Sequence, residues 1–73
     1  MSTLLQKAEF VFNYIKDKKE FTVNEIMQYL INHGFKAHKS QVSLILSVTE
    51  SRYPLSITRY GYIYEVELKK AGV

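Results

Sequence analysis

Apolar residues near the start of the chain recur every three or four positions, the spacing of an amphipathic helix. A cap precedes them, because Thr3 and Gln6 have the spacing of a capping box. The pattern ends at a polar run that begins with Lys16. We therefore predict a helix over residues 4–18, with the apolar positions Leu4, Ala8, Val11, Phe12 and Ile15 on its buried side.

A second helix signal begins at Thr22, which can form a capping box with Glu25. Phe21, just before the cap, has the position of a hydrophobic staple on Ile26. Gly34 supplies the left-handed residue at which helices often stop. The sequence predicts a helix of about three turns. Its single buried face comprises Val23, Ile26, Met27, Leu30 and Ile31.

A third helical pattern follows a short basic connector. Its inward stripe is Val42, Ile45, Leu46 and Thr49, and its other side carries Ser40, Ser43 and Ser47 with Gln41 and Leu44 between. Serine is a modest helix former, so several serines on one face indicate close approach to a partner or hydrogen bonding. An ordinary solvated face is the alternative.

From Leu55 onward the period changes from helical to alternating. Apolar residues Leu55, Ile57, Tyr62, Tyr64, Val66 and Leu68 fall on one side, and Ser56, Thr58, Glu65 and Glu67 on the other. Residues 59–62 supply the turn, where Gly61 allows a positive φ. The pattern predicts an antiparallel hairpin.

These elements predict an α+β fold of three helices followed by a two-stranded antiparallel wing, with a short extra strand near Phe21. We expect one domain over residues 1–73, of which residues 69–73 form a flexible tail. The predicted core consists of Leu4, Ala8, Val11, Phe12, Ile15, Val23, Ile26, Met27, Leu30, Val42, Ile45, Leu46, Ile57, Val66 and Leu68.

Composition excludes several classes of protein. The 73 residues include no Cys, which rules out disulfides and thiolate metal sites and favours a reducing compartment, with cytoplasm as the expectation. No apolar run approaches the roughly 20 residues that span a bilayer, so we expect no membrane partner. Ten Lys and Arg against seven Asp and Glu give a net charge of +3, which suits an anionic partner without identifying one.

Residues capable of catalysis or metal binding do not form a recognisable set. His33 and His38 lack the i, i+4 spacing of two ligands on one helical face. We interpret His33 as a favourable charge or a donor near a helix C-terminus, and His38 as a cap for the third helix. Glu65 and Glu67 share a strand face and are interpreted as solubility groups that protect a sheet edge. We expect a non-enzyme without a cofactor or metal.

The order helix, helix, helix, hairpin resembles the winged helix-turn-helix DNA-binding superfamily over nearly the whole chain. Residues 40–46 resemble its recognition helix: a polar start, a buried Val, a Ser and an Ile-Leu pair. In that superfamily the third helix enters the major groove and the hairpin tip touches the flanking backbone or minor groove. The resemblance implies double-stranded DNA as the partner, with contacts from Lys36, Lys39, Ser40, Gln41, Ser43, Ser47 and Arg59.

Within that set, Lys36 and Arg59 would lie near phosphates, and Lys39 and Arg59 would supply phosphate contacts. The presumed reading face carries no Arg, so Gln41 is expected to read adenine. Glu65 and Glu67 would repel phosphates if their side of the wing faced the duplex.

Two functions fit these observations. One is a small phage- or archaeal-type DNA-binding protein, a transcription regulator or accessory DNA-binding factor. The alternative is a protein-interaction module, such as an inhibitor or adaptor of a polymerase, nuclease or other host machine. Tyr is favoured at interface hot spots, and the anchors of that module would be Phe10, Tyr14, Tyr60 and Tyr62. Phe10 and Tyr14 lie off the main stripe of the first helix, which predicts either burial beneath the wing or a homodimer.

Overall fold

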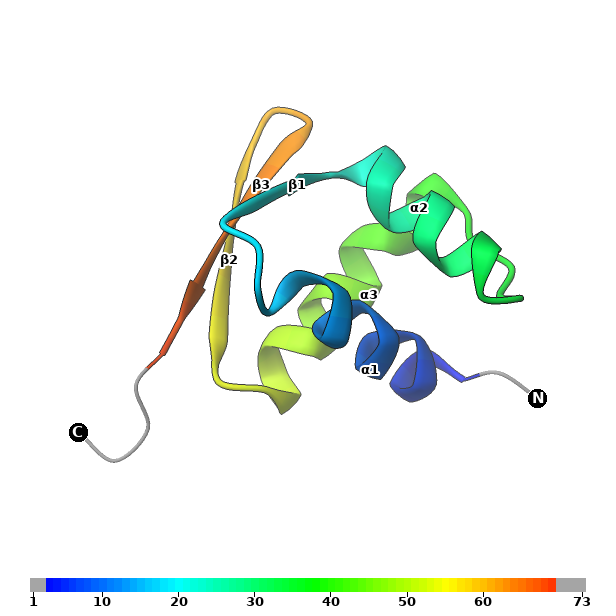
Figure 1. The fold of residues 1–73 in the computed structure, drawn as a ribbon, viewed down its shortest axis with the longest axis horizontal. Coiled ribbons are helices and arrows are strands. Elements are labelled where there is room, and N and C mark those ends of the chain that lie inside the picture. The colour runs from blue at the N-terminus through cyan, green and yellow to red at the C-terminus, as the bar shows by residue number, and fades with distance from the viewer. Residues whose placement is uncertain (1–2, 70–73) are drawn as a thin grey trace.

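The computed structural model describes residues 3–69 as three helices and a three-stranded antiparallel sheet (Figure 1). The elements are α1 (Leu4–Ile15), β1 (Glu20–Thr22), α2 (Val23–Asn32), α3 (Lys39–Arg52), β2 (Leu55–Tyr60) and β3 (Ile63–Leu68). This arrangement confirms the predicted α+β, winged-helix-like fold, including the short strand at Phe21. Most of the predicted tail, residues 70–73, lies outside the described residues.

Helix α1 begins at the predicted capping box. The Gln6 amide donates to the Thr3 hydroxyl at 3.2 Å, and the Thr3 amide donates to the Gln6 side chain at 3.1 Å. The helix ends at Ile15, three residues before the predicted end. Ile15 is the last buried residue of its stripe, and the exposed polar residues 16 and 17 after it form a turn. No packing therefore favours another helical turn, and the chain is free to turn back into β1.

Helix α2 has both of its predicted ends. Thr22 and Glu25 form the reciprocal capping box at its start. At its C-terminus Gly34 has φ +84°, the Gly34 amide donates to the Ile31 carbonyl at 3.0 Å, and the Phe35 amide donates to the Leu30 carbonyl at 3.0 Å. Those two bonds are the pair of a Schellman motif, which satisfies the last carbonyls of the helix.

The sheet has the strand order β1-β3-β2, so that the C-terminal hairpin pairs with the segment before α2. Tyr60 faces Ile63 across a two-residue loop, Gly61-Tyr62, in which Gly61 has φ +65°. A positive φ at the first loop residue is the pattern of a type II′ turn. The turn is thus shorter than predicted, because Arg59 and Tyr60 belong to β2.

The core combines all three helices with the inner face of the sheet. It comprises Ala8, Val11, Ile15, Phe21, Val23, Ile26, Leu30, Val42, Ile45, Leu46, Leu55 and Tyr64. Predicted members Phe12, Met27, Ile57 and Val66 are only partly buried at its border. Leu4 and Leu68 were wrongly predicted, with 37% and 56% of their surfaces exposed. Ile31, predicted on the buried face of the second helix, is also exposed, at 48%, because it turns away from the core that Leu30 enters.

Phe21 and Tyr64 are core residues that the prediction missed. They are opposite each other in the β1–β3 register, and their rings stack with centroids 5.3 Å apart. Leu55, fully buried at the start of β2, was also left out of the predicted core. Its neighbour Leu68 on β3 lies at the end of the hairpin, where half of its surface stays open.

Phe10 and Tyr14 pack within the molecule, against α2 and the connector after it. The centroid of the Phe10 ring lies 4.9 Å from that of Phe35 and 5.4 Å from that of His33. The ring centroids of Tyr14 and Tyr29 are 4.4 Å apart. The expectation that the wing would cover them is wrong. These intramolecular contacts cover part of both rings, which reduces the aromatic surface on which the predicted homodimer rested. The homodimer itself stays a prediction.

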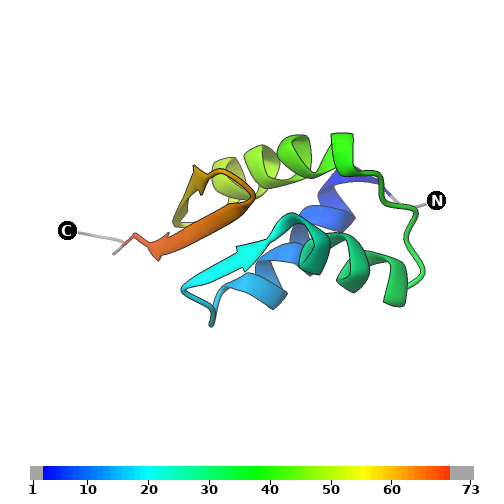
Figure 2. The ribbon, with the colours of Figure 1, turned by 90° about the horizontal axis from the view of Figure 1, so that it is seen from above.

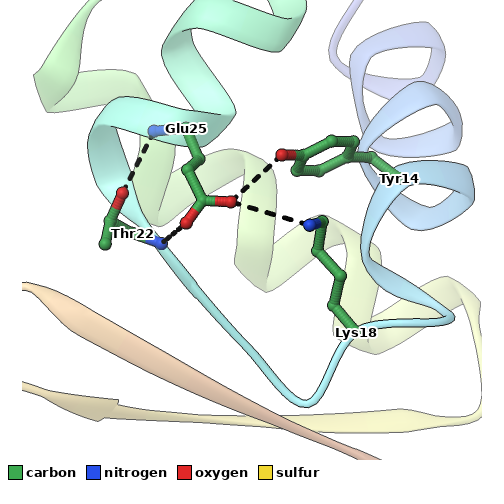
Figure 3. Close-up of polar contacts among 4 residues, drawn as sticks. All are labelled: Tyr14, Lys18, Thr22 and Glu25. Atoms are coloured by element: carbon green, nitrogen blue, oxygen red, sulfur yellow. Dashed lines mark hydrogen bonds and ion pairs between the residues drawn. The ribbon is translucent and has the colours of Figure 1, made fainter.

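Glu25 joins the end of α1 to the start of α2 (Figure 3). One carboxylate oxygen accepts the Thr22 amide at 3.2 Å, and the other accepts the Tyr14 hydroxyl at 3.0 Å. Lys18 Nζ lies 3.8 Å from that second oxygen and 4.7 Å from the centroid of the Tyr14 ring. A residue predicted only as a helix cap therefore also links the end of α1 to the start of α2.

Candidate nucleic-acid interface

Helix α3 lies along one side of the molecule, with α1 and α2 on the other (Figure 2). Its inner stripe is fully used by the core, as predicted, including Thr49, whose hydroxyl donates to the Ile45 carbonyl at 2.8 Å. Its outer side carries the predicted contacts Lys39, Ser40, Ser43 and Ser47, all of them exposed. This face consists mainly of short hydroxyl side chains, which allow another surface to approach the helix backbone closely.

Leu44 lies midway along α3, at the border of the serine stripe, with 51% of its surface exposed. It follows Ser40 by four residues and precedes Ser47 by three, the two spacings that make neighbours on a helix surface. The sequence pattern placed Leu44 on this side but did not identify it as a contact. An apolar residue at an open helical position was the available signal.

Gln41 does not lie on the open face with the serines. Its side chain is half-buried, and its amide oxygen is enclosed by protein without a hydrogen-bond partner among the described residues. Reading an adenine edge would require this side chain to rotate outward. The structure thus separates Gln41 from the other predicted contacts of the third helix.

A cleft of about 400 Å³ lies between the wing tip and the helices. It is lined by Thr22, Val23 and Asn24 at the start of α2, by Lys39 at the start of α3, and by Arg59, Gly61 and Tyr62 of the hairpin. The two cations that were predicted to contact phosphates, Lys39 and Arg59, are therefore brought together from distant parts of the sequence. The start of α2 forms one wall of the same cleft, and the Glu25 carboxylate in its first turn offsets the helix dipole there.

Arg59 is held in a defined orientation by its neighbours. Its Nε donates to the Gly61 carbonyl at 2.7 Å, across the turn. Its guanidinium carbon lies 6.0 Å from the centroid of the Tyr64 ring, which faces Arg59 in the β2–β3 register. Pairing with Tyr64 places Arg59 on the inner face of the sheet, toward the helices.

The charges around this cleft are positive and not neutralised. Within residues 3–69, the ion pair found is that of Lys18 with Glu25, which involves neither Lys39 nor Arg59. Lys36, the remaining predicted phosphate contact, is exposed in the connector before α3 and does not line the cleft. An anion that enters the cleft would meet two cations there.

Glu65 and Glu67 lie away from this cleft. They alternate with Tyr64 and Val66 along β3, which turns their side chains to the outer face of the sheet. There they line a second hollow of about 690 Å³ together with Glu20 and with Lys16, Lys18 and Lys19. The expected repulsion of phosphates by these two carboxylates therefore falls on the opposite face of the wing.

The two histidines have separate structural positions. His33 Nδ1 lies 2.8 Å from the Tyr29 carbonyl, which can only accept, so His33 is the predicted donor at the C-terminus of α2. His38 occupies the N-cap position of α3, but its side chain makes no capping hydrogen bond, which contradicts its predicted role. Neither histidine lines the cleft.

Comparison with known proteins gives no match to a family model, to a curated protein or to a solved structure. Over the part of the chain that the structure describes, none of the helices has the length and apolar character needed to cross a bilayer.

Proposed function

We propose that this chain is a small winged-helix DNA-binding protein, a transcription regulator or an accessory DNA-binding factor, and not an enzyme. The observation that carries the proposal is the cleft in which Lys39 of α3 and Arg59 of the wing lie beside the N-terminus of α2. A phosphate group fits a cleft that brings a Lys and an Arg together. The exposed serine face of α3 would then enter the major groove next to that phosphate.

Each element has a distinct part in the proposed complex. Lys39 and Arg59, which both line the cleft, would bind the phosphate backbone of the DNA. Such contacts position the protein on the duplex but do not read its sequence. Ser40, Ser43 and Ser47 face the groove, where hydroxyls can bond to phosphates or base edges. Lys36 in the connector adds a more distant charge. With so few cations, affinity should be modest and strongly dependent on salt.

A titration of random-sequence duplex DNA between roughly 50 and 200 mM salt tests the proposal. Lys39→Gln and Arg59→Gln should each weaken binding to all sequences and reduce the slope of log affinity against log salt by at most about one. Lys16→Gln is the matched control, since it removes the same charge from an exposed residue outside the cleft.

Two results would count against this function. If Lys16→Gln weakened binding as much as Lys39→Gln, the protein would respond to net charge and the cleft would not be the phosphate site. If wild-type protein bound no duplex even at the lowest salt, DNA would not be its partner.

One observation favours the second candidate, a protein-interaction module. Tyr60 and Tyr62 at the hairpin tip have 59% and 72% of their surfaces exposed, and such aromatic residues are typical anchors of protein interfaces. Phe10 and Tyr14, the other expected anchors, are partly buried against α2 and the connector, and are less suited to this role. Tyr60 lies outside the cleft that Tyr62 helps to line. If the tyrosines serve a protein partner, Tyr60→Ala should leave duplex affinity unchanged and abolish binding to a protein captured by the wild-type chain.

A further inference from the structure

The exposed face of α3 lacks the side chains that read G·C pairs. Guanine is most often read by Arg or Lys, but the cations of α3 are confined to its first residue, Lys39, and its last, Arg52. Cytosine is read by a carboxylate, and the one carboxylate in α3 belongs to Glu50. That group accepts the Ile57 amide at 3.1 Å, so it is tied to β2.

What this face offers instead is an exposed apolar side chain. Leu44 is 51% exposed and lies between Ser40 and Ser47 on the helix surface. A single exposed leucine is ordinary in any protein. Here its position matters, because it lies midway along α3 and beside Ser40 and Ser47, on the surface that would enter the groove. In the major groove, the apolar group that distinguishes one base from the others is the C5-methyl of thymine.

We propose that α3 reads thymine through its C5-methyl group, with Leu44 as the contact, and that the protein prefers A·T-rich duplexes. This inference rests on the proposed DNA-binding function. The flanking serines are short enough to let Leu44 reach the groove floor, and their hydroxyls bond to any base edge. The enclosed amide oxygen of Gln41 is consistent with this division, since the expected adenine contact is turned inward.

Replacing thymine by uracil tests the contact, because uracil keeps every hydrogen-bonding group of the base and lacks only the methyl. The probes are two short DNA duplexes of alternating sequence. One pairs deoxyadenosine with thymidine, and the other pairs deoxyadenosine with deoxyuridine. Wild-type protein should bind the thymine duplex more tightly, by about fourfold for each methyl group buried. Leu44→Ala should bind the thymine duplex more weakly and lose the difference between the two probes.

Leu5→Ala is the matched control, since Leu5 on α1 is also 51% exposed and lies outside the proposed interface. It should retain the full difference between thymine and uracil. Circular dichroism and thermal melting of both variants would establish that each remains folded. A difference that persisted in Leu44→Ala would reflect the altered shape of the uracil duplex, and would overturn the assignment of Leu44.

Cytosine provides an independent readout, because a methyl group at its C5 lies at the same place in the groove. Methylating the cytosines of a G·C duplex should raise wild-type affinity and leave Leu44→Ala unaffected. Equal binding of wild-type protein to the thymine and uracil probes would overturn the inference while leaving DNA binding in place. Failure to bind either probe at low salt would remove the proposed function itself and favour a protein partner.

Discussion

The Tyr14 hydroxyl donates to Glu25 at 3.0 Å and thereby connects α1 to the capping box of α2. Tyr14→Phe removes this hydrogen bond and keeps the ring that packs on Tyr29. Since the bond has a charged acceptor but is only part-buried, we expect the free energy of unfolding to fall by about 1 kcal/mol. In a domain of this size that lowers the melting temperature by roughly 4–8 °C. Tyr62→Phe, at the exposed hairpin tip, should leave it unchanged.

Leu30 tests the core. It is fully buried in α2, whereas its neighbour Ile31 is 48% exposed. Leu30→Ala should cost about 2–5 kcal/mol, because the cavity cannot close completely. Ile31→Ala should cost far less. Denaturant unfolding of the two variants measures the difference, and equal losses would mean that the buried face of α2 is misassigned.

Glu65 lies opposite Glu20 in the β1–β3 register, so two like charges are neighbours on adjacent strands. Glu65→Gln should therefore stabilise the protein by roughly 0.2–1 kcal/mol at low ionic strength. The gain should shrink as salt screens the repulsion. Glu67→Gln is the control on the same strand face, because Glu67 lies opposite Ser56. A gain from Glu67→Gln as large as that from Glu65→Gln would argue against the cross-strand pair as its cause.

Gly61 tests the turn of the wing. A Cβ at this position would meet no atom within 4 Å, so a substitution is opposed by the backbone conformation alone, at φ +65°. Gly61→Ala should cost about 1–2 kcal/mol. A chemically synthesised chain with D-alanine at this position should not lose stability, since a D residue favours positive φ. Comparing the thermal melts of the two chains separates backbone strain from any effect of the added methyl.

Elements that depend on near neighbours were predictable from the sequence. Both capping boxes, the glycine at the end of α2 and the helical stripes are set by residues within a turn or two of each other. The length of the hairpin turn could not be predicted in this way. The strand residues and the loop residues around Gly61 are of similar polar and aromatic types, so the sequence does not separate them. Arg59 and Tyr60 became strand once they faced Tyr64 and Ile63.

Contacts between distant segments could not be read in the same way. Phe21 is buried because β1 pairs with β3, and no local pattern shows that Tyr64 covers it. Phe10 and Tyr14 find their partners on α2 and in the connector. For the candidate interface, the sequence supplied Lys39 and Arg59 as separate cations, and only the fold shows that they share one cleft. The inward turn of the Gln41 amide depends on its surroundings, which the sequence does not show.

The hydrogen bond from the Ile57 amide to Glu50 has a consequence for self-association. Strand β2 is an edge of the sheet, and its outward-facing backbone groups are a template on which a strand of another molecule could add. Glu50 occupies one of those amide donors and leaves a negative charge beside the edge. To pair with β2, an incoming strand would have to displace the Glu50 carboxylate from the Ile57 amide. If the carboxylate stayed in place, it would lie against the backbone carbonyls of the incoming strand. Helix α3, which carries the candidate reading face, thus also disfavours pairing of β2 with a strand of another molecule.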